Sequence, residues 1–189
     1  MANYYISDLH VGHEKALVFD KRPFANIEEE RIGLTERWNS VVNNDDVVWV
    51  LGDVGFKKSY TADFLRGLNG TKNLIVGNHD MKFIEDPAFR RLFKEVTPYK
   101  VVDEEILGSE RKLVLSHYPI LTYQCHYYGW VHLYGHVHMS VEYEFVRNCI
   151  EKLDGLQGFP CIMYNVGCML PYIDYTPRTL EHILLNGFM

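Results

Sequence analysis

Apolar residues occur in short runs that alternate with longer amphipathic stretches along the chain. Val47–Leu51 is an uninterrupted apolar run, and Tyr4–Ile6 and Asn73–Val76 have the same character. Short runs of this kind, rich in β-branched and aromatic residues, predict buried strands. We expect further strands over the ranges 96–106, 112–116, 130–134 and 160–166.

The amphipathic stretches predict helices. Asn26 is placed to cap the first long one, with Glu29 at the capping-box position. Its apolar residues share one helical face: Ile27, Leu34, Trp38 and Val41. We expect further helices over 61–68, from Asp86-Pro87 and after Thr176-Pro177, whereas 141–153 fits either period and stays open. Helices alternating with early strands predict an α/β domain with a partly parallel sheet.

Length and charge narrow the class of protein. The 189 residues suit a single domain over 1–189, and no linker or repeat divides them. A net charge of −6 does not favour a general nucleic-acid binder, because such binding relies on Lys and Arg. No apolar run approaches the ~20 residues needed to span a bilayer. Residues 1–10 lack the features of a secretory signal and the four cysteines form no CxxC pair, so we expect a cytoplasmic protein.

Polar clusters directly follow five of the predicted strands. They are Asp8-Leu9-His10, Gly52-Asp53, Gly77-Asn78-His79-Asp80, Ser116-His117 and Gly135-His136-Val137-His138. Ligands of open α/β sheets bind beyond the carboxyl ends of the strands, so these clusters are candidates for one shared site. Imidazole and carboxylate ligands suit manganese, iron, nickel or zinc better than calcium.

Most of these clusters also have a structural interpretation when taken alone. An Asp after a strand is often a cap or turn residue, and Ser116-His117 fits a strand end. Two histidines spaced as His136 and His138 point the same way on an extended segment and can chelate. The Gly77–Asp80 cluster is the most specific, and five clusters in order favour a functional site.

Together, these motifs resemble the signature of the calcineurin-like metallophosphoesterases. Asn165-Val-Gly167 resembles that family's closing strand and turn. The segments Asp8–His13 and Lys21–Phe24 are similar to a group of small stand-alone bacterial and phage phosphoesterases. The resemblance implies an α/β fold, called α+β in some schemes. Two mixed β-sheets would pack as a sandwich flanked by helices, with a dinuclear metal site at the carboxyl edge of the strands.

The resemblance also implies a ligand set. One metal would be held by Asp8, His10 and His138. The second would be held by Asn78, His117 and His136, with Asp53 bridging both. His79 would be the general acid, and Asp80 would orient its imidazole ring. The implied cofactors are two divalent transition-metal ions, with manganese favoured.

The implied activity is hydrolysis of a small phosphoester by a metal-bridging hydroxide that attacks phosphorus in line. A phosphodiester is favoured over a phosphomonoester because no long insertion is available to cap the site. One alternative is a non-catalytic protein-interaction scaffold of the same fold, although such scaffolds typically lose the histidine present here as His79. Another is a nuclease, for which the chain lacks a basic face. Neither membrane binding nor a particular oligomeric state is indicated.

Four further residues have alternative interpretations. His13 and Arg22 either face the substrate phosphate or serve as a helix-cap histidine and a surface arginine. His126 and His132 lie beside aromatic residues and are interpreted as packing or surface residues.

Overall fold

The first sheet is parallel throughout, and its strands follow one another in chain order. The computed structural model describes residues 1–106, 108–156 and 160–187. The strands of this sheet are β1 (Asn3–Ile6), β2 (Val47–Val50), β3 (Thr71–Ile75) and β4 (Val96–Thr97). Parallel neighbours require crossover connections, and each connection here contains at least one helix.

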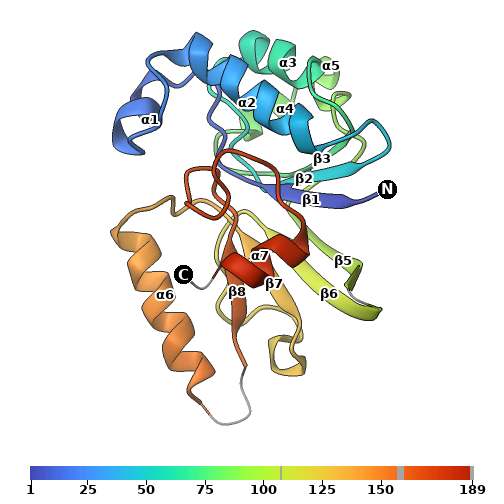
Figure 1. Cartoon of the computed structure of the whole chain (residues 1–189), viewed down its shortest axis with the longest axis vertical. Coiled ribbons are helices and arrows are strands. Elements are labelled where there is room, and N and C mark those ends of the chain that lie inside the picture. The colour runs from blue at the N-terminus through green and yellow to red at the C-terminus, as the bar shows by residue number, and fades with distance from the viewer. Residues whose placement is uncertain (107, 157–159, 188–189) are drawn as a thin grey trace.

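The helices between these strands cover one face of the first sheet (Figure 1). Successive crossovers of one hand, taken in one direction along the sheet, place their helices on the same side. The opposite face is therefore free to pack against another layer. The helices are α1 (Glu14–Phe19), α2 (Ile27–Val41), α3 (Lys58–Arg66), α4 (Met81–Ile84) and α5 (Pro87–Arg90).

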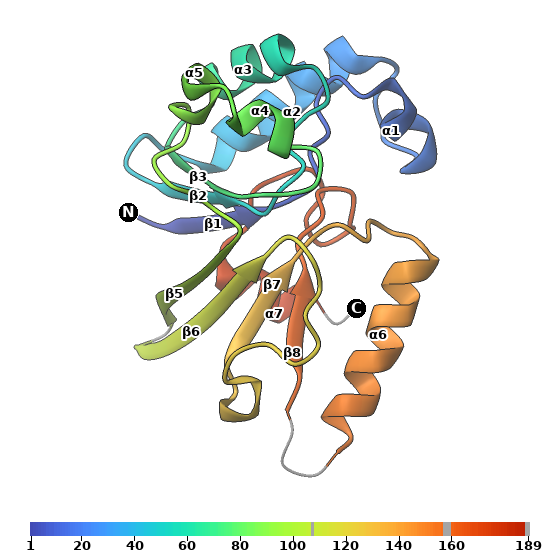
Figure 2. The ribbon, with the colours of Figure 1, turned by 180° about the vertical axis from the view of Figure 1, so that it is seen from behind.

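The second sheet is mixed and packs on that free face. β5 and β6 are antiparallel, whereas the β6–β7 and β7–β8 pairs are parallel. Figure 2 shows α6 running alongside this sheet, away from the first one. The elements of this half are β5 (Tyr99–Ile106), β6 (Ser109–Ser116), β7 (Val131–Tyr134), α6 (Val141–Asp154), β8 (Ile162–Asn165) and α7 (Leu180–Asn186).

Alternation along β6 separates two apolar clusters. Leu113 and Leu115 join the large cluster between the two sheets, and Val114 points to the opposite face. There it packs with Tyr123 and with Val146 of α6. A strand whose two faces are both covered is apolar at every position, which explains the continuous runs in the sequence.

The two sheets meet where the segment after β8 pairs with Ser7, the residue that follows β1. Ser7 N–H donates to the carbonyl of Val166 at 2.8 Å, and Cys168 N–H donates to the carbonyl of Ser7 at 2.9 Å. This contact brings the carboxyl end of the second sheet beside that of the first. The segments that follow β1 and β7 therefore lie next to each other.

The predicted α/β sandwich of two sheets flanked by helices is confirmed, with the first sheet parallel rather than mixed. The range 141–153, which fitted either period, is helix α6, capped by Ser140, whose hydroxyl accepts from Glu142 N–H at 3.1 Å. The last helix is capped by Thr179 rather than Thr176, because the Thr176 hydroxyl instead donates to the carbonyl of Asp174.

The predicted strand over 96–106 is divided between the two sheets. β4 ends at Thr97 and β5 begins at Tyr99, with only Pro98 between them. Proline lacks the N–H that a continuous ladder requires, and this is where the chain leaves one sheet for the other. In the described parts of the chain, no helix is both long and apolar enough to cross a membrane.

Replacing Trp38 should reduce stability strongly. Trp38 is 1% exposed, packs in the main cluster and donates its indole N–H to the carbonyl of Asn69 at 3.0 Å. We expect Trp38→Ala to lower the free energy of unfolding by about 3–5 kcal/mol in urea titrations. Ile32→Ala, on the same helix but 46% exposed, should change it by less than about 0.5 kcal/mol. Equal effects of the two variants would contradict the assigned core.

In the folded protein, His132 should remain neutral at pH values well below the ordinary pKa of histidine. Burial lowers the pKa of His132 from 6.5 to about 4; its Nδ1–H donates to the carbonyl of Val114, and Nε2 accepts from Ile120 N–H. Its contribution to stability is then complete above pH 6.5 and is lost as the pH falls to about 4, by up to about 3 kcal/mol. NMR titration of the ring measures this midpoint, and a midpoint near 6.5 would contradict the assignment.

Candidate metal centre

The five polar clusters converge at the carboxyl ends of the strands. Asp8 follows β1, Asp53 follows β2 and His79 follows β3 in the first sheet. His117 follows β6, and His136 and His138 follow β7, in the second. All seven ligand candidates and His79 thus lie where the two sheets meet.

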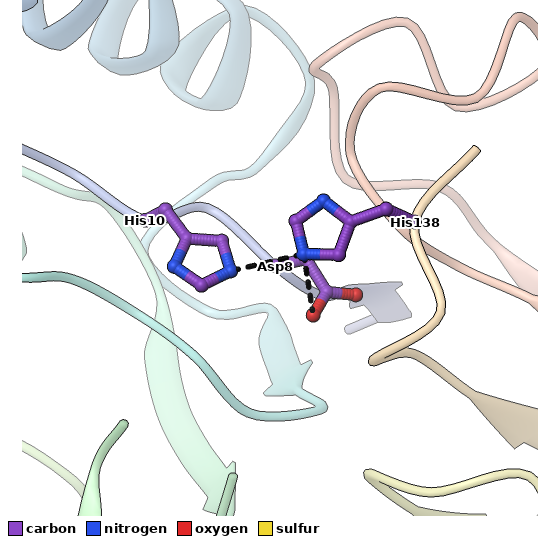
Figure 3. Close-up of side chains that lie close together, drawn as sticks. All are labelled: Asp8, His10 and His138. Atoms are coloured by element: carbon purple, nitrogen blue, oxygen red, sulfur yellow. Dashed lines mark hydrogen bonds and ion pairs between the residues drawn. The ribbon is translucent and has the colours of Figure 1, made fainter. Parts of the chain in front are cut away.

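Asp8, His10 and His138 form a first group (Figure 3). The Nε2 atoms of the two imidazoles are 3.1 Å apart, and Nε2 of His138 lies 3.9 Å from Oδ1 of Asp8. Asp8 is fully buried and His10 is 3% exposed. The three side chains point toward one another from segments that are 128 residues apart in the chain.

Asp53, His117 and His136 form a second group, and Asn78 lies beside it. Nε2 of His117 is 3.6 Å from Oδ2 of Asp53 and 3.1 Å from Oδ1 of Asn78. Within each group, one ligand atom per residue lies within 4.8 Å of the others. This is the inventory that the resemblance implied for the second metal.

Asp53 lies between the two groups. Its Oδ2 is 3.6 Å from Nε2 of His10 on one side and 3.6 Å from Nε2 of His117 on the other. The same oxygen is 4.0 Å from Nε2 of His79, whose side chain is 35% exposed. The Asp53 carboxylate therefore adjoins both groups.

The hydrogen bonds of two histidines indicate which ring nitrogen is free to bind a metal. Nδ1 of His117 faces the carbonyl oxygen of Leu51 at 2.8 Å, and Nδ1 of His138 faces Oδ1 of Asp20 at 2.9 Å. Both partners only accept, so the rings donate through Nδ1, and in a neutral ring Nε2 carries a lone pair. These two lone pairs face carboxylate oxygens, and a positive ion between them would satisfy both atoms. The buried His and Asp groups could therefore hold metal.

Burial changes the ionisation of the first group. It lowers the pKa of His10, and the neighbouring His138 adds to this effect. Burial also raises the pKa of Asp8. For His138, burial lowers the pKa, but the hydrogen bond to Asp20 and the nearby Asp8 outweigh it and leave the pKa raised. A neutral, buried His10 is in the form that binds metal.

Several candidate ligands have a strained backbone. Among the described residues, nine non-glycine residues have positive φ, and five of these are ligand candidates: Asp8, His10, Asp53, His136 and His138. Such conformations cost roughly 1–3 kcal/mol each and concentrate at functional sites, where the surrounding structure imposes them.

The glycines of two clusters make room for carboxylates from other segments. A Cβ on Gly77 would lie 2.3 Å from Oδ1 of Asp53, and one on Gly135 would lie 2.5 Å from Oδ2 of Asp8. No larger residue fits at either place without displacing a candidate ligand. The spacing of glycine and ligand in these motifs therefore reflects packing between clusters.

The carboxylates are held by neutral donors. Asp8 accepts from the Ser7 hydroxyl at 2.7 Å and from His136 N–H at 3.0 and 3.1 Å. Asp53 accepts from His79 N–H at 2.9 Å through Oδ1, which leaves Oδ2 toward the imidazoles. These bonds fix the orientation of both carboxylates.

Asp80 does not orient the His79 ring, which corrects the expectation from the sequence. Its two oxygens accept from the N–H groups of Asp53, Val54 and Gly77 at 2.8–3.0 Å. No hydrogen bond joins the Asp80 carboxylate to the His79 ring in the described structure. Asp80 instead ties the segment after β2 to the segment after β3.

Arg22 occupies neither of its two expected places, whereas His13 lies at the start of α1. Arg22 is 5% exposed and bonded to Asp20 and Glu30, so it neither faces a substrate nor lies on the surface. His13 occupies the N-cap position of α1, although its side chain makes no capping hydrogen bond; its ring stacks on Phe56 at 4.2 Å and lies 5.8 Å from the His10 ring.

Sequence reasoning missed Asp20, which contacts His138. A carboxylate next to a ligand histidine is a common partner in metal sites. No motif marks Asp20, and 118 residues separate it from His138. Only the tertiary structure identifies it.

Comparison with known proteins places the chain in a family. No family model matches it. Protein MJ1445 of Methanocaldococcus jannaschii, described as uncharacterized, is 33% identical over 149 residues, which cover 76% of this chain and 74% of that protein. The gene 66 protein of Mycobacterium phage D29 is 30% identical over 160 residues, covering 73% and 79%. The chain belongs to the same family as these two proteins.

Solved structures support the fold. Protein AQ665 of Aquifex aeolicus, of unknown function, aligns over 97% of both chains with a TM-score of 0.69 and 22% identity, which shows a shared fold alone. The phosphopantetheinyl hydrolase PptH of Mycobacterium tuberculosis covers 96% of this chain and 76% of its own. Its TM-score of 0.38 and identity of 15% are too low to indicate a common function.

A methyl group at position 77 should disturb metal binding by displacing Asp53 and the segment after β2. Gly77→Ala places Cβ against the Asp53 carboxylate, so we expect manganese affinity to fall by about tenfold or more, measured by calorimetry on chelator-treated protein. Gly67→Ala is the matched control, because the nearest atom to its Cβ is 3.4 Å away. Unchanged affinity in Gly77→Ala would show that Asp53 is not held as described.

Proposed function

We propose that this protein is a metal-dependent phosphoester hydrolase with two divalent ions, manganese favoured. The observation that carries the proposal is the convergence of imidazole lone pairs and carboxylate oxygens on both sides of Asp53. Asp8, His10 and His138 would hold one ion, and Asn78, His117 and His136 the other. Asp53 would contact both.

Bound divalent ions supply a water-derived nucleophile near neutral pH and stabilise the charge on a phosphoryl group during transfer. The surrounding residues are suited to support this chemistry. Asp8 and His10 are almost fully removed from water, so charges beside them are weakly screened. His79, by contrast, reaches the surface from the same cluster and is accessible to a substrate.

His79 is the proposed general acid. Its backbone N–H is anchored to Asp53, and its ring contacts the His10 ring edge-on at 5.2 Å. This position lets Nε2 donate a proton to the oxygen that leaves phosphorus. No side chain is required as nucleophile, so the reaction proceeds without a phospho-enzyme.

The surroundings of the cluster favour a substrate with an organic group on the phosphate. Phe19 and Tyr118 are about half exposed and contact the rings of His138 and His136 at 5.4 and 4.5 Å. Phe56 lies 6.2 Å from the His79 ring. Exposed aromatic faces next to the ions would accept an aryl group or a base. This supports an aryl or nucleoside phosphoester as the substrate and is compatible with the proposed small phosphodiester.

Two variants test the roles of Asp53 and His79. Asp53→Asn should lose metal binding and hydrolysis together. His79→Ala should retain metal binding and lose about 10²–10⁴-fold in kcat on esters with a poor leaving group. The loss should be much smaller on bis(p-nitrophenyl) phosphate, whose leaving group needs no proton. The control is Asp63→Asn, in an exposed ion pair with Arg66. Full turnover in both site variants would refute the mechanism.

A substrate panel separates this function from its alternatives. Chelator-treated protein reloaded with manganese is assayed with mononucleotides, cyclic nucleotides, dinucleoside polyphosphates, phosphopeptides and DNA. Hydrolysis of a small diester supports the proposal. Metal binding without any hydrolysis would favour the scaffold, and preferential cleavage of DNA would favour the nuclease.

A further inference from the structure

Arg22 lies behind the first group of candidate ligands, and each of its three nitrogens donates hydrogen bonds. Its side chain is fully buried. Nη2 donates to the carbonyl of Asp8 at 3.0 Å, and Nη1 donates to the carbonyl of Leu9 at 2.6 Å and to Glu30 at 2.9 Å. Nε and Nη2 donate to Oδ2 of Asp20 at 3.0 and 2.7 Å.

Asp20 divides its two oxygens between Arg22 and His138. Oδ2 accepts from the guanidinium, and Oδ1 lies 2.9 Å from Nδ1 of His138. The carboxylate is 2% exposed, so water does not compete for these bonds. Because a carboxylate only accepts, this contact places the His138 proton on Nδ1 and the lone pair on Nε2.

The same guanidinium donates to carbonyls of the strained backbone that carries Asp8 and His10. Asp8 and His10 have φ values of 57° and 48°, and Arg22 binds the carbonyls of Asp8 and of the residue between them. Arg22 is linked to His138, which has a φ of 47°, through the hydrogen bonds of Asp20. One side chain thus connects both halves of a group whose members are 128 residues apart.

We propose that Asp20 and Arg22 are positioning residues of the metal centre. Asp20 holds His138 in the Nδ1–H tautomer with Nε2 facing Asp8 and His10, and Arg22 orients Asp20 and the Asp8–His10 backbone. The role of these residues in metal binding rests on the proposed function. The tautomer itself is a property of the chain without metal.

Asp20→Asn gives a specific test. Arg22 only donates, so it takes the amide oxygen of the new side chain, which leaves the NH₂ group toward Nδ1 of His138. Nδ1 must then accept, and the ring proton moves to Nε2, the atom that would bind metal. We expect the variant to show the opposite tautomer and manganese affinity reduced about 10–100-fold.

Nitrogen-15 NMR of the imidazole rings in metal-free protein measures the tautomer directly, at alkaline pH where the ring is neutral. The His138 signal is assigned by its absence in His138→Gln. Wild type should show protonated Nδ1, and Asp20→Asn protonated Nε2 with the other histidine signals unchanged. Asp63→Asn, which changes an exposed carboxylate, should match wild type.

Arg22→Lys should lower manganese affinity because one ammonium cannot replace all the guanidinium bonds.

The outcomes separate this inference from the proposed function. A wild-type His138 protonated on Nε2, or an Asp20→Asn variant with unchanged tautomer and affinity, would overturn the positioning role even if the enzyme is active. A purely structural role would lower stability and leave the tautomer unchanged, which also overturns it. The expected tautomers in a protein that hydrolyses no phosphoester would support the positioning role and reject the proposed function alone.

Discussion

The candidate metal centre depends on keeping the protons of two imidazoles on Nδ1, on the side of the ring away from the candidate ligand carboxylates. At His117 and His138, Nδ1 donates to a buried acceptor, and in the neutral ring Nε2 presents a lone pair to Asp53 or Asp8. Lone pairs and carboxylate oxygens that converge in a buried space repel one another unless a cation lies between them. The rest of the fold must therefore hold these groups together against their mutual repulsion.

The fold does so with several independent devices. Parallel strands direct their carboxyl ends to one edge, and the hydrogen bonds between Ser7 and the segment after β8 join the two sheets there. Backbone N–H groups hold Asp8 and Asp53, and Asp80 ties two loops together. Buried Arg22 supports the strained segment that contains Asp8 and His10. Together, these contacts restrain the segments that carry the candidate ligands.

Much of the fold could be predicted because its signals are local. Apolar runs marked the strands, and Asn26 caps α2 as expected, accepting from two backbone N–H groups. Predictions failed where one local sequence pattern was compatible with two different structures. The run over 96–106 is apolar enough for one strand, but Pro98 divides it between two sheets. The role of Asp80 was assigned from its neighbour in sequence, whereas its carboxylate is used by the backbone of other segments.

The sequence by itself determined the chemistry of the candidate site: which imidazoles and carboxylates follow strands, and that such ends gather at one edge. The resemblance implied how these groups pair and that Asp53 lies between them, whereas only the tertiary structure decided that Asp20 and Arg22 support His138. The physical reason is the sequence separation over which each interaction acts. Periodicity and capping act over a few residues, whereas the contact of His138 with Asp20 joins positions 118 residues apart and exists only once the sheets have packed.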